Sequence, residues 1–425
     1  MNPDCTPSAE AARPPVSFVC DPGARKILKV LHVEVGGRFG GSLRILETYL
    51  RHADKRQTIH DVLFYYPTPG AKALAGLVRN IFVLCAGSPR EPQPSRFGSQ
   101  GTREARWESA FVRRAFSELR RIARIPKVLR TVRAIASLLQ RENYDVVHVN
   151  NTFSYQAPTL LAAKWSKTPI LAHVRNSVPP SGLNRALLRC ADLVVTMNRS
   201  LERELRSWGA PVSVRTCRDG VELPAPDPSS ALAWRTKLLP HGGFLVGSVG
   251  QLQPQKGFDV FVRAARLVIA SNPSVRFAIA GSGPLQSSLE SLISELGLQD
   301  YFFLCGFQSD AASFLAALDL FVSSSHWEGG PLVVCEAMLL GKPVVATDTG
   351  WNRELIASDG TGKLVQPRDP RALATAIVES FASHRAMADR AEKNIPGVRQ
   401  RSDPARSSRQ TDAFIRELCG WERPD

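Results

Sequence analysis

The sequence predicts an α/β protein built from two doubly wound parallel sheets, one in each half of the chain. Short strands that are almost entirely apolar alternate with segments of three-to-four-residue apolar spacing. Strands buried on both faces are typical of parallel sheets whose crossovers are helices. The alternation stops at a Pro/Ser-rich segment, Leu223–Ser230, and then begins again. At 425 residues the chain is also too long for one ordinary domain.

Strand positions and domain limits follow from this alternation. Before the Pro/Ser-rich segment we expect seven strands, at Ile27–Val33, Thr58–Tyr65, Asn80–Leu84, Tyr144–Val149, Pro169–Val174, Asp192–Met197 and Val212–Thr216. After it we expect six, at Phe244–Val249, Val275–Ala280, Tyr301–Cys305, Leu318–Ser323, Pro343–Ala346 and Lys363–Val365. The resulting limits are a tail at 1–25, a first domain at 26–225 with a helical insertion at about 88–141, a second domain at 231–405, and a C-terminal helix at 406–425 that packs back on the first domain.

Composition narrows the class of protein. The hydrophobic fraction of 44% and charged fraction of 22% are those of a soluble globular protein. No apolar run reaches the roughly 18–20 residues that cross a bilayer. The N-terminus lacks a basic region followed by an apolar one, so we expect no signal peptide and a cytoplasmic location. The eight cysteines form no Cys-x-x-Cys pair, which excludes a disulfide framework and a zinc site of that type.

The net charge of +15 lies almost entirely in the first half. Residues 1–225 carry 34 Lys and Arg against 18 Asp and Glu, whereas residues 226–425 carry 20 against 21. The stretch Arg103–Arg133 alone holds ten basic and three acidic residues, with apolar residues at helical spacing and Pro126 dividing it. Two interpretations of this stretch stay open. It is either a helix that packs on the core and exposes its basic face to solvent, or a helix that lies on the anionic inner surface of a membrane. Nucleic-acid binding is disfavoured because the aromatic residues are not interleaved with the basic run in the way that a platform for stacking bases needs.

The most specific stretch for chemistry is the run from His326 to Ala346. It follows an expected strand and enters a helix near Pro331, a residue tolerated at the first helical position. Glu328 therefore lies in the loop at the carboxyl edge of the sheet, and Glu336 lies one to two turns into the helix. Buried carboxylates at these places accept hydrogen bonds from the hydroxyls of a polyol ligand. Free backbone N–H groups at the helix start favour an anion.

This string resembles the Glu-x7-Glu motif of the retaining family-4 glycosyltransferases. Four further elements of that family follow the same order. They are Gly250-Gln-Leu-Gln-Pro-Gln-Lys-Gly257, Ala280-Gly-Ser-Gly-Pro284, Thr349-Gly-Trp-Asn-Arg-Glu354 and Gly360-Thr-Gly-Lys-Leu-Val-Gln-Pro367. The resemblance covers most of the second half. It implies the GT-B fold, in which two Rossmann-like domains face each other across a cleft and the second holds a nucleotide sugar.

Carried over by position, the resemblance implies a role for each matching residue. Glu336 would bind the ribose hydroxyls, Glu328 the donor sugar, and Lys256 the diphosphate. The remaining donor-binding positions would be Gly281, Gly283 and Pro284 near the nucleotide, and the backbones of Leu332 and Val333 near the phosphates. One departure concerns charge: Gln251 stands where the family has an arginine, so one of two expected phosphate cations is missing. Arg353 or Arg218 would be the compensating cations.

In the first half the resemblance is looser. Gly40 and Gly41 precede a helix and are similar to the family's Gly-Gly loop, although a simple tight turn explains them as well. His173 ends an expected strand and resembles the histidine that lines the donor sugar's pocket, the alternative being a structural hydrogen-bonder. The acceptor would contact strand-end residues of this domain, namely Asn150, Asn151 and Arg175.

The expected activity is that of a retaining hexosyltransferase that needs no metal and no cofactor beyond its nucleotide-sugar co-substrate. The family favours a UDP-sugar as donor. The basic first half suggests a lipid-linked or anionic glycan acceptor at the cytoplasmic membrane face, as in bacterial polysaccharide or glycolipid assembly. Three alternatives stay open: a nucleotide-sugar epimerase, a glycosyl phosphorylase, and a sugar-nucleotide-binding scaffold without turnover. The pyridoxal-phosphate lysine signature of the phosphorylases is missing from the chain.

Overall fold

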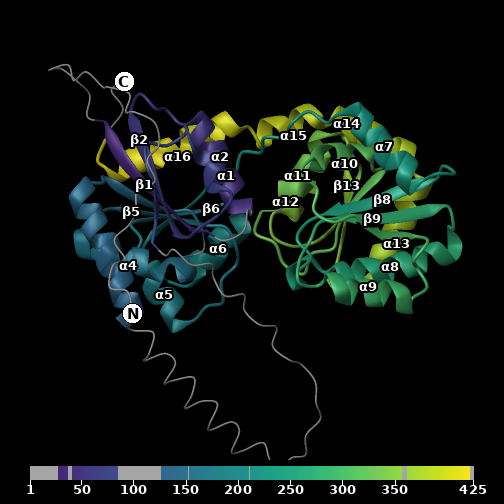
Figure 1. Ribbon diagram of the computed structural model, residues 1–425, viewed down its shortest axis with the longest axis horizontal. Helices are drawn as coiled ribbons and strands as arrows, with labels where there is room; N and C mark the ends of the chain where they lie inside the picture. Colours follow the sequence, from purple (N-terminus) through teal and green to yellow (C-terminus); the bar gives the residue numbers. More distant parts are fainter. Residues whose placement is uncertain are drawn as a thin grey trace, which may run out of the picture.

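A computed structural model describes residues 27–36, 41–84, 126–151, 153–209, 211–330, 332–356 and 361–421. The expected N-terminal tail and most of the expected insertion, including the basic stretch up to residue 125, lie outside these ranges. Figure 1 shows two domains side by side, with the C-terminal helix returning across the first of them.

The first domain is built on a parallel sheet of seven strands in the order β3-β2-β1-β4-β5-β6-β7. Its faces are both buried, since Leu31 and Val33 belong to one hydrophobic cluster and Leu28 and Val30 to another. This explains why the strands read as nearly continuous apolar runs. The strands are β1 (Leu28–Gly36), β2 (Thr58–Tyr66), β3 (Ile81–Val83), β4 (Val146–Val149), β5 (Ile170–Val174), β6 (Leu193–Thr196) and β7 (Ser213–Thr216).

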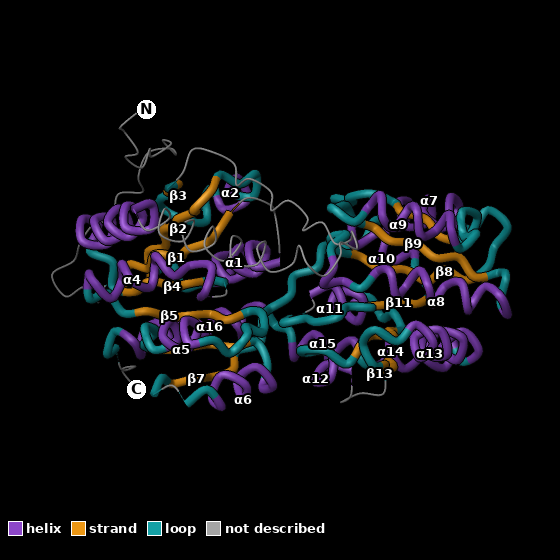
Figure 2. The backbone as a smooth tube through the Cα atoms, turned by 90° about the horizontal axis from the view of Figure 1, so that it is seen from below, coloured by secondary structure: helices purple, strands orange, loops and turns teal. Residues whose placement is uncertain are grey.

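The second domain repeats the design with six parallel strands in the order β10-β9-β8-β11-β12-β13. Its strands are β8 (Phe244–Val249), β9 (Val275–Ala280), β10 (Phe302–Leu304), β11 (Leu320–Ser323), β12 (Val344–Thr347) and β13 (Gly362–Val365). All thirteen strands overlap the expected ranges, and helices cover both sheets (Figure 2). The predicted fold class, two doubly wound α/β domains, is therefore confirmed.

Helices connect the strands, and several begin at a residue whose side chain accepts a hydrogen bond from the first turn. Asn198 caps α6 through Leu201 N at 2.7 Å, and Asp227 caps α7. The helices of the first domain are α1 (Gly41–His52), α2 (Ala71–Leu74), residues 126–142, the 3-10 turn η2 (Phe153–Gln156), α4 (Ala157–Ser166), α5 (Gly182–Leu188) and α6 (Arg199–Ser207). The later helices are α7 (Pro228–Leu238), η3 (Pro254–Lys256), α8 (Phe258–Ser271), α9 (Gln286–Glu295), α10 (Ala311–Ala317), α11 (Leu332–Leu339), α12 (Asn352–Ile356), α13 (Pro370–Ala382), α14 (His384–Lys393), α15 (Ile395–Arg401) and α16 (Pro404–Leu418).

The chain passes between the domains twice. The first passage follows β7 at residues 217–227, and the second joins α15 to α16 at residues 402–404. The two passages touch: Val221 N donates to Ser402 O at 2.9 Å, and a Cβ on Gly220 would lie 2.4 Å from Pro404 Cα. Only glycine fits at that contact.

Helix α16 belongs to the second half of the sequence but packs on the first domain. Tyr49 on α1 donates a hydrogen bond of 2.5 Å to Asp412 on α16. Arg215 on β7 makes two hydrogen bonds of 2.6 Å to Glu417. These contacts fasten the end of the chain to the first sheet (Figure 1). Among the described helices, none is both long and apolar enough to cross a bilayer.

Candidate active site

The carboxyl ends of both sheets face each other at their topological switch points. In a doubly wound sheet the strand order reverses at this point, and ligands bind in the crevice there. The switch point of the first sheet lies between β1 and β4, and that of the second lies between β8 and β11. Gly41, Asn150, Lys256 and Glu328 lie in the segments that follow these four strands. The sequence-predicted residues of both domains therefore meet at one interface.

Lys256 and Glu328 form the central pair of the second domain. The Lys256 ammonium makes an ion pair with Glu328 Oε1, and both side chains are largely buried. Ser325 Oγ donates to the same carboxylate oxygen at 2.8 Å, and Gln255 Nε2 donates to the other at 3.3 Å. The carboxylate is thus held in one orientation by three donors.

The predicted glycines surround the loop that carries Lys256. A Cβ on Gly281 would lie 1.8 Å from Gly250 O, and one on Gly283 would lie 2.5 Å from Leu252 O. The Lys256 side chain runs past Gly250 on the other side, with Cε 3.4 Å from where a Cβ of Gly250 would stand. The turn that ends in Pro284 is therefore in backbone contact with the loop that contains Gln251, since Leu252 N donates to Ser282 O at 3.0 Å.

A second cluster joins α11 to the first domain. Leu332 and Val333 form the first turn of α11, while the preceding Pro331 lies outside the described residues. Glu336 is 2% exposed and pairs with Arg44 of α1 at 2.8 Å. Burial raises the pKa of the Glu336 carboxyl, and the Arg44 charge partly offsets that rise. A Cβ on Gly41 would lie 3.6 Å from Leu332 Cδ1, whereas Gly40 lies outside the described residues.

The loop after Glu328 fits tightly against the strand ends of the first domain. A Cβ on Gly329 would stand 1.6 Å from Arg175 O, and one on Gly330 would stand 2.4 Å from Met197 Sδ. Asn198 Nδ2 donates to Gly329 O at 2.9 Å. The two glycines of the motif therefore allow the domains to approach each other next to Glu328.

The predicted acceptor residues form a third group, in the first domain. Arg175 makes an ion pair with Asp219 and donates to Asn150 Oδ1 at 2.8 Å and to His173 Nδ1 at 3.4 Å. Asn151 Nδ2 donates to Ser42 Oγ at 3.4 Å. His173 is 3% exposed and is followed by one more strand residue, so it lies inside β5 instead of at its tip. Its Nδ1 accepts from Arg175, and its Nε2 lies 3.8 Å from Asp219 Oδ1.

Sequence reasoning missed two charged residues. Arg44 follows the Gly40–Gly41 pair by three residues, but nothing local showed that it would reach Glu336 on the other domain. Glu34 is a buried acid near the end of β1 that contacts Asn150 Nδ2. Burial raises its pKa to about 7 despite the opposing effects of Asn150, Arg175 and Ser42. The available signal was its position directly after the expected strand Ile27–Val33.

Arg353 and Arg218, the cations expected to compensate for Gln251 in place of the family's arginine, both lie next to a carboxylate. Arg353 forms an ion pair with Asp348, and Arg218 lies 3.4 Å from Glu354 across the domain interface. Arg44 lies at the start of α1, opposite the start of α11, and is 38% exposed at its side chain. Of these three arginines, Arg44 is the one whose position faces the helix start of the Glu328–Glu336 motif.

Comparison with known families identifies both domains. The model described as "Glycosyl transferases group 1" matches residues 233–396, and the "Glycosyl transferase 4-like domain" model matches residues 65–217. The galactosyltransferase of Escherichia coli that uses UDP-Gal and α-D-GlcNAc-diphosphoundecaprenol is 26% identical, over 59% of this chain and 70% of its own length. A D-inositol 3-phosphate glycosyltransferase of Thermobispora bispora is 30% identical, over 59% of this chain and 65% of its own length.

Solved structures share the arrangement of both domains. HepE of Anabaena, in a crystal with UDP and glucose, has a TM-score of 0.72 at 22% identity and covers 91% of this chain and 99% of its own. Sucrose-phosphate synthase of Thermosynechococcus elongatus has a TM-score of 0.72 at 18% identity, covering 93% and 100%. Together with the two family matches and the paired sheets, this shows that the chain belongs to the group 1 glycosyltransferases of the GT-B fold.

Proposed function

We propose that the protein transfers a hexose from a nucleotide-diphosphate sugar to an acceptor hydroxyl with retention of configuration. The observation that carries this proposal is the Lys256–Glu328 pair. It lies at the switch point of the second sheet, beside a glycine-lined turn and against the strand ends of the first domain. A cation, a buried acid and a backbone that a phosphate can approach closely are the groups that nucleotide-sugar chemistry needs.

The chemistry assigned to each residue follows from charge. As the bond from the sugar to the diphosphate breaks, the leaving group gains negative charge, so a preorganised cation lowers the barrier. Lys256 supplies that cation, and Glu328, released from it by the diphosphate, accepts hydrogen bonds from the donor sugar. Glu336 accepts hydrogen bonds from the ribose. The leaving phosphate takes the proton of the acceptor hydroxyl on the same face, and neither a protein nucleophile nor a metal is part of this scheme.

We propose a UDP-sugar as donor. Support comes from the E. coli relative, whose name states UDP-Gal, and from the HepE crystals with UDP-glucose. In a thermal-shift panel of UDP- and GDP-sugars, the donor is expected to raise the melting temperature, and the same sugar is expected to be transferred when EDTA is present. NMR of the product is expected to show the anomeric configuration of the donor. Stabilisation without transfer to any acceptor would favour the scaffold alternative instead.

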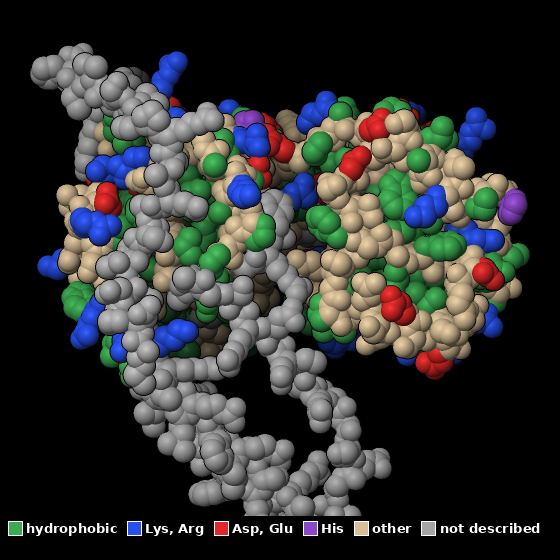
Figure 3. Space-filling view, viewed as in Figure 1, with side chains coloured by type: hydrophobic (Ala, Val, Ile, Leu, Met, Phe, Trp, Pro, Cys, Tyr) green, Lys and Arg blue, Asp and Glu red, His purple; other side chains and the backbone are tan. Residues whose placement is uncertain are grey.

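We also propose that the acceptor is lipid-linked and met at an anionic membrane surface. The E. coli relative uses a diphosphoundecaprenol acceptor. On the view in Figure 3, Lys and Arg outnumber Asp and Glu on the described part of the first domain, while both signs cover the second. Large apolar side chains on η2, α4 and α5 are exposed in this basic domain, namely Tyr155, Trp165 and Leu183. Such aromatic and aliphatic groups insert at a headgroup boundary, and basic residues strengthen the attraction.

Vesicle flotation tests this surface. The protein is expected to float with vesicles that contain anionic lipid and to stay behind with neutral ones. The double variant Trp165→Ser with Leu183→Ser is expected to weaken flotation. The matched control Leu232→Ser removes an equally exposed leucine from α7 in the second domain and is expected to float normally. Equal flotation with neutral and anionic vesicles would contradict the proposal.

A further inference from the structure

Four buried histidines form a row across the first sheet, one on each of four neighbouring strands. They are His60 on β2, His32 on β1, His148 on β4 and His173 on β5, and each is at most 3% exposed. The register places His32 directly opposite His148. Successive ring centroids are 5.2, 5.1 and 5.8 Å apart. Imidazoles at this spacing in a core are either bonded to one another or destabilising.

Hydrogen bonds link three of the rings and give the row a direction. The hydroxyl of Thr58 donates its hydrogen to Asp54 O at 2.7 Å. Because that hydrogen is used, the same Oγ1 accepts from His60 Nε2, which lies 2.8 Å away and therefore carries a hydrogen. A neutral imidazole has one N–H and one acceptor nitrogen. His60 Nδ1 therefore accepts from His32 Nε2 at 3.0 Å, and His32 Nδ1 accepts from His148 Nδ1 at 2.8 Å. The consequence is that His148 Nε2 carries a lone pair and no hydrogen.

The rings are neutral because burial disfavours their charged forms. It lowers the pKa of His60 to about 4, with Lys55 lowering it further and Asp61 opposing. Burial also lowers the pKa of His32, His148 and His173 well below the usual value. For His148 and His173, the positive charge of Arg175 lowers the pKa further. Each ring therefore has a single tautomer, and the hydroxyl of Thr58 selects it for the bonded three.

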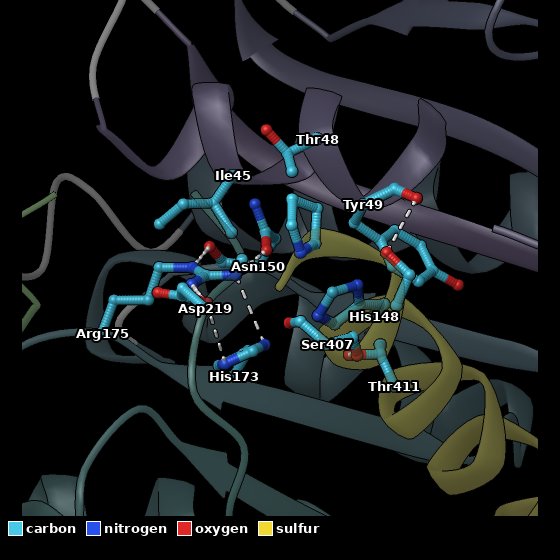
Figure 4. A pocket seen from close by; sticks show the side chains of 13 residues that line it. Ile45, Thr48, Tyr49, His148, Asn150, His173, Arg175, Asp219, Ser407 and Thr411 are labelled. Carbon is cyan, nitrogen blue, oxygen red and sulfur yellow. Dashed lines mark hydrogen bonds and ion pairs between the residues drawn. The ribbon is translucent and has the colours of Figure 1, made fainter. Parts of the chain in front are cut away.

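The free end of the row opens on a pocket that α16 covers (Figure 4). Three buried polar atoms of this pocket make no hydrogen bond to the described residues: His148 Nε2, Asp219 Oδ2 and His173 Nε2, the last of which lies 3.8 Å from Asp219 Oδ1. Because Arg175 donates to His173 Nδ1, the hydrogen of His173 is on Nε2. The pocket thus presents one donor and two acceptors. Among the other polar groups that line it, Asn150 is bonded to Arg175 and Thr411 to Ser407 O.

We propose that this pocket binds one water molecule, which accepts from His173 Nε2 and donates to His148 Nε2 and Asp219 Oδ2. Water has the two hydrogens and the lone pair that this set of one donor and two acceptors requires. In this assignment His148 is a positioning residue. Through the water it holds Asp219 and hence Arg175, whose backbone oxygen packs on Gly329 beside Glu328. The proposal does not depend on which sugar is transferred.

Histidine-selective ¹⁵N NMR on the full chain tests the tautomers directly, because protonated and unprotonated ring nitrogens resonate far apart. At pH 7.5 we expect N–H at Nε2 for His32, His60 and His173 but at Nδ1 for His148, with assignments from single His→Gln variants. A crystal structure is expected to show one water within hydrogen-bond distance of all three pocket atoms. A hydrogen on His148 Nε2, a dry pocket, or a substrate hydroxyl in the place of the water would each overturn the proposal.

Variants of Thr58 test whether the row acts as a unit. Thr58→Val removes the acceptor of His60 Nε2–H, so the opposite direction of the hydrogen bonds along the row becomes similar in free energy. The ¹⁵N signals of His60, His32 and His148 are then expected to move together toward a mixture of tautomers. Thr58→Ser keeps the hydroxyl and is expected to restore them. The control Thr168→Val removes a buried hydroxyl bonded to Ser166 before β5 and is expected to change none of the three. Unaltered His148 signals in folded T58V protein would show that the row does not select its tautomer.

Discussion

Replacing Lys256 with methionine is expected to lower kcat for sugar transfer by about 100- to 1,000-fold, the usual effect of removing one preorganised group that stabilises developing charge. Methionine keeps the length of the side chain past Gly250 but removes the ammonium that pairs with Glu328. The loss should fall on kcat more than on KM, because the diphosphate is most negative as the bond to the sugar breaks. Initial rates at varied donor concentration measure both constants.

Two further variants isolate the cause. Lys256→Met leaves the largely buried Glu328 carboxylate without its cation, so a loss of stability could imitate a loss of chemistry. The double variant with Glu328→Gln removes that unpaired charge and is expected to recover the melting temperature but not the rate. Lys363→Met is the matched control, since Lys363 pairs with Glu379 on the outside of the same domain. If K256M transferred sugar as fast as K363M, the assigned role of Lys256 would be wrong.

Acidification below pH 6.5 is expected to destabilise the first domain strongly. Burial lowers the pKa values of the four histidines of the row in the native state. Between pH 6.5 and these lowered pKa values, the histidines of the unfolded chain bind protons, whereas those of the native state do not. Their contribution to stability is therefore present above 6.5 and is lost as the pH falls. Burial raises the pKa of Glu34, Glu336 and Asp412, which act in the opposite direction because their native forms hold extra protons.

The histidines outnumber these acids, so unfolding takes up roughly one to three protons between pH 6.5 and 5. The free energy of unfolding should then fall by about 1.4–4 kcal/mol for each pH unit, a large share of a total of about 5–15 kcal/mol. Urea titrations at a series of pH values measure this slope. His60→Gln removes one titrating ring and is expected to reduce the slope by about 1.4 kcal/mol per unit. A stability that is flat from pH 6.5 to 5 would contradict the assignment of neutral buried rings.

Local patterns were enough to predict the fold and the place of Glu328 at the edge of the second sheet, whereas Lys256, Gly281 and Gly283 were predicted from the family resemblance. Strands buried on both faces leave continuous apolar runs, and the close backbone approaches of Gly281 and Gly283 demand residues without a Cβ, so both can be read from sequence. The meeting of Lys256 with Glu328 followed because each comes after a strand at the same edge of one sheet. These features depend only on neighbouring segments.

The remainder depends on how distant segments pack. The pairing of Arg44 with Glu336 requires the relative placement of two domains, which no local pattern encodes. The histidine row requires the register of four strands whose histidines lie at positions 32, 60, 148 and 173, and each histidine alone reads as an ordinary polar residue in a strand. The contacts of His173 with its neighbours in the sheet likewise depend on tertiary packing.

The two passages of chain between the domains have a mechanical consequence. Because they run together at Gly220 and Pro404, they form a single hinge instead of two separate tethers. Bending about that line preserves the bond from Val221 to Ser402, whereas twisting or sliding would break it. We expect opening of the interface to be a rotation about this line, in which α16 moves with the first domain and the contacts of Arg44 with Glu336 and of Asn198 with Gly329 separate together.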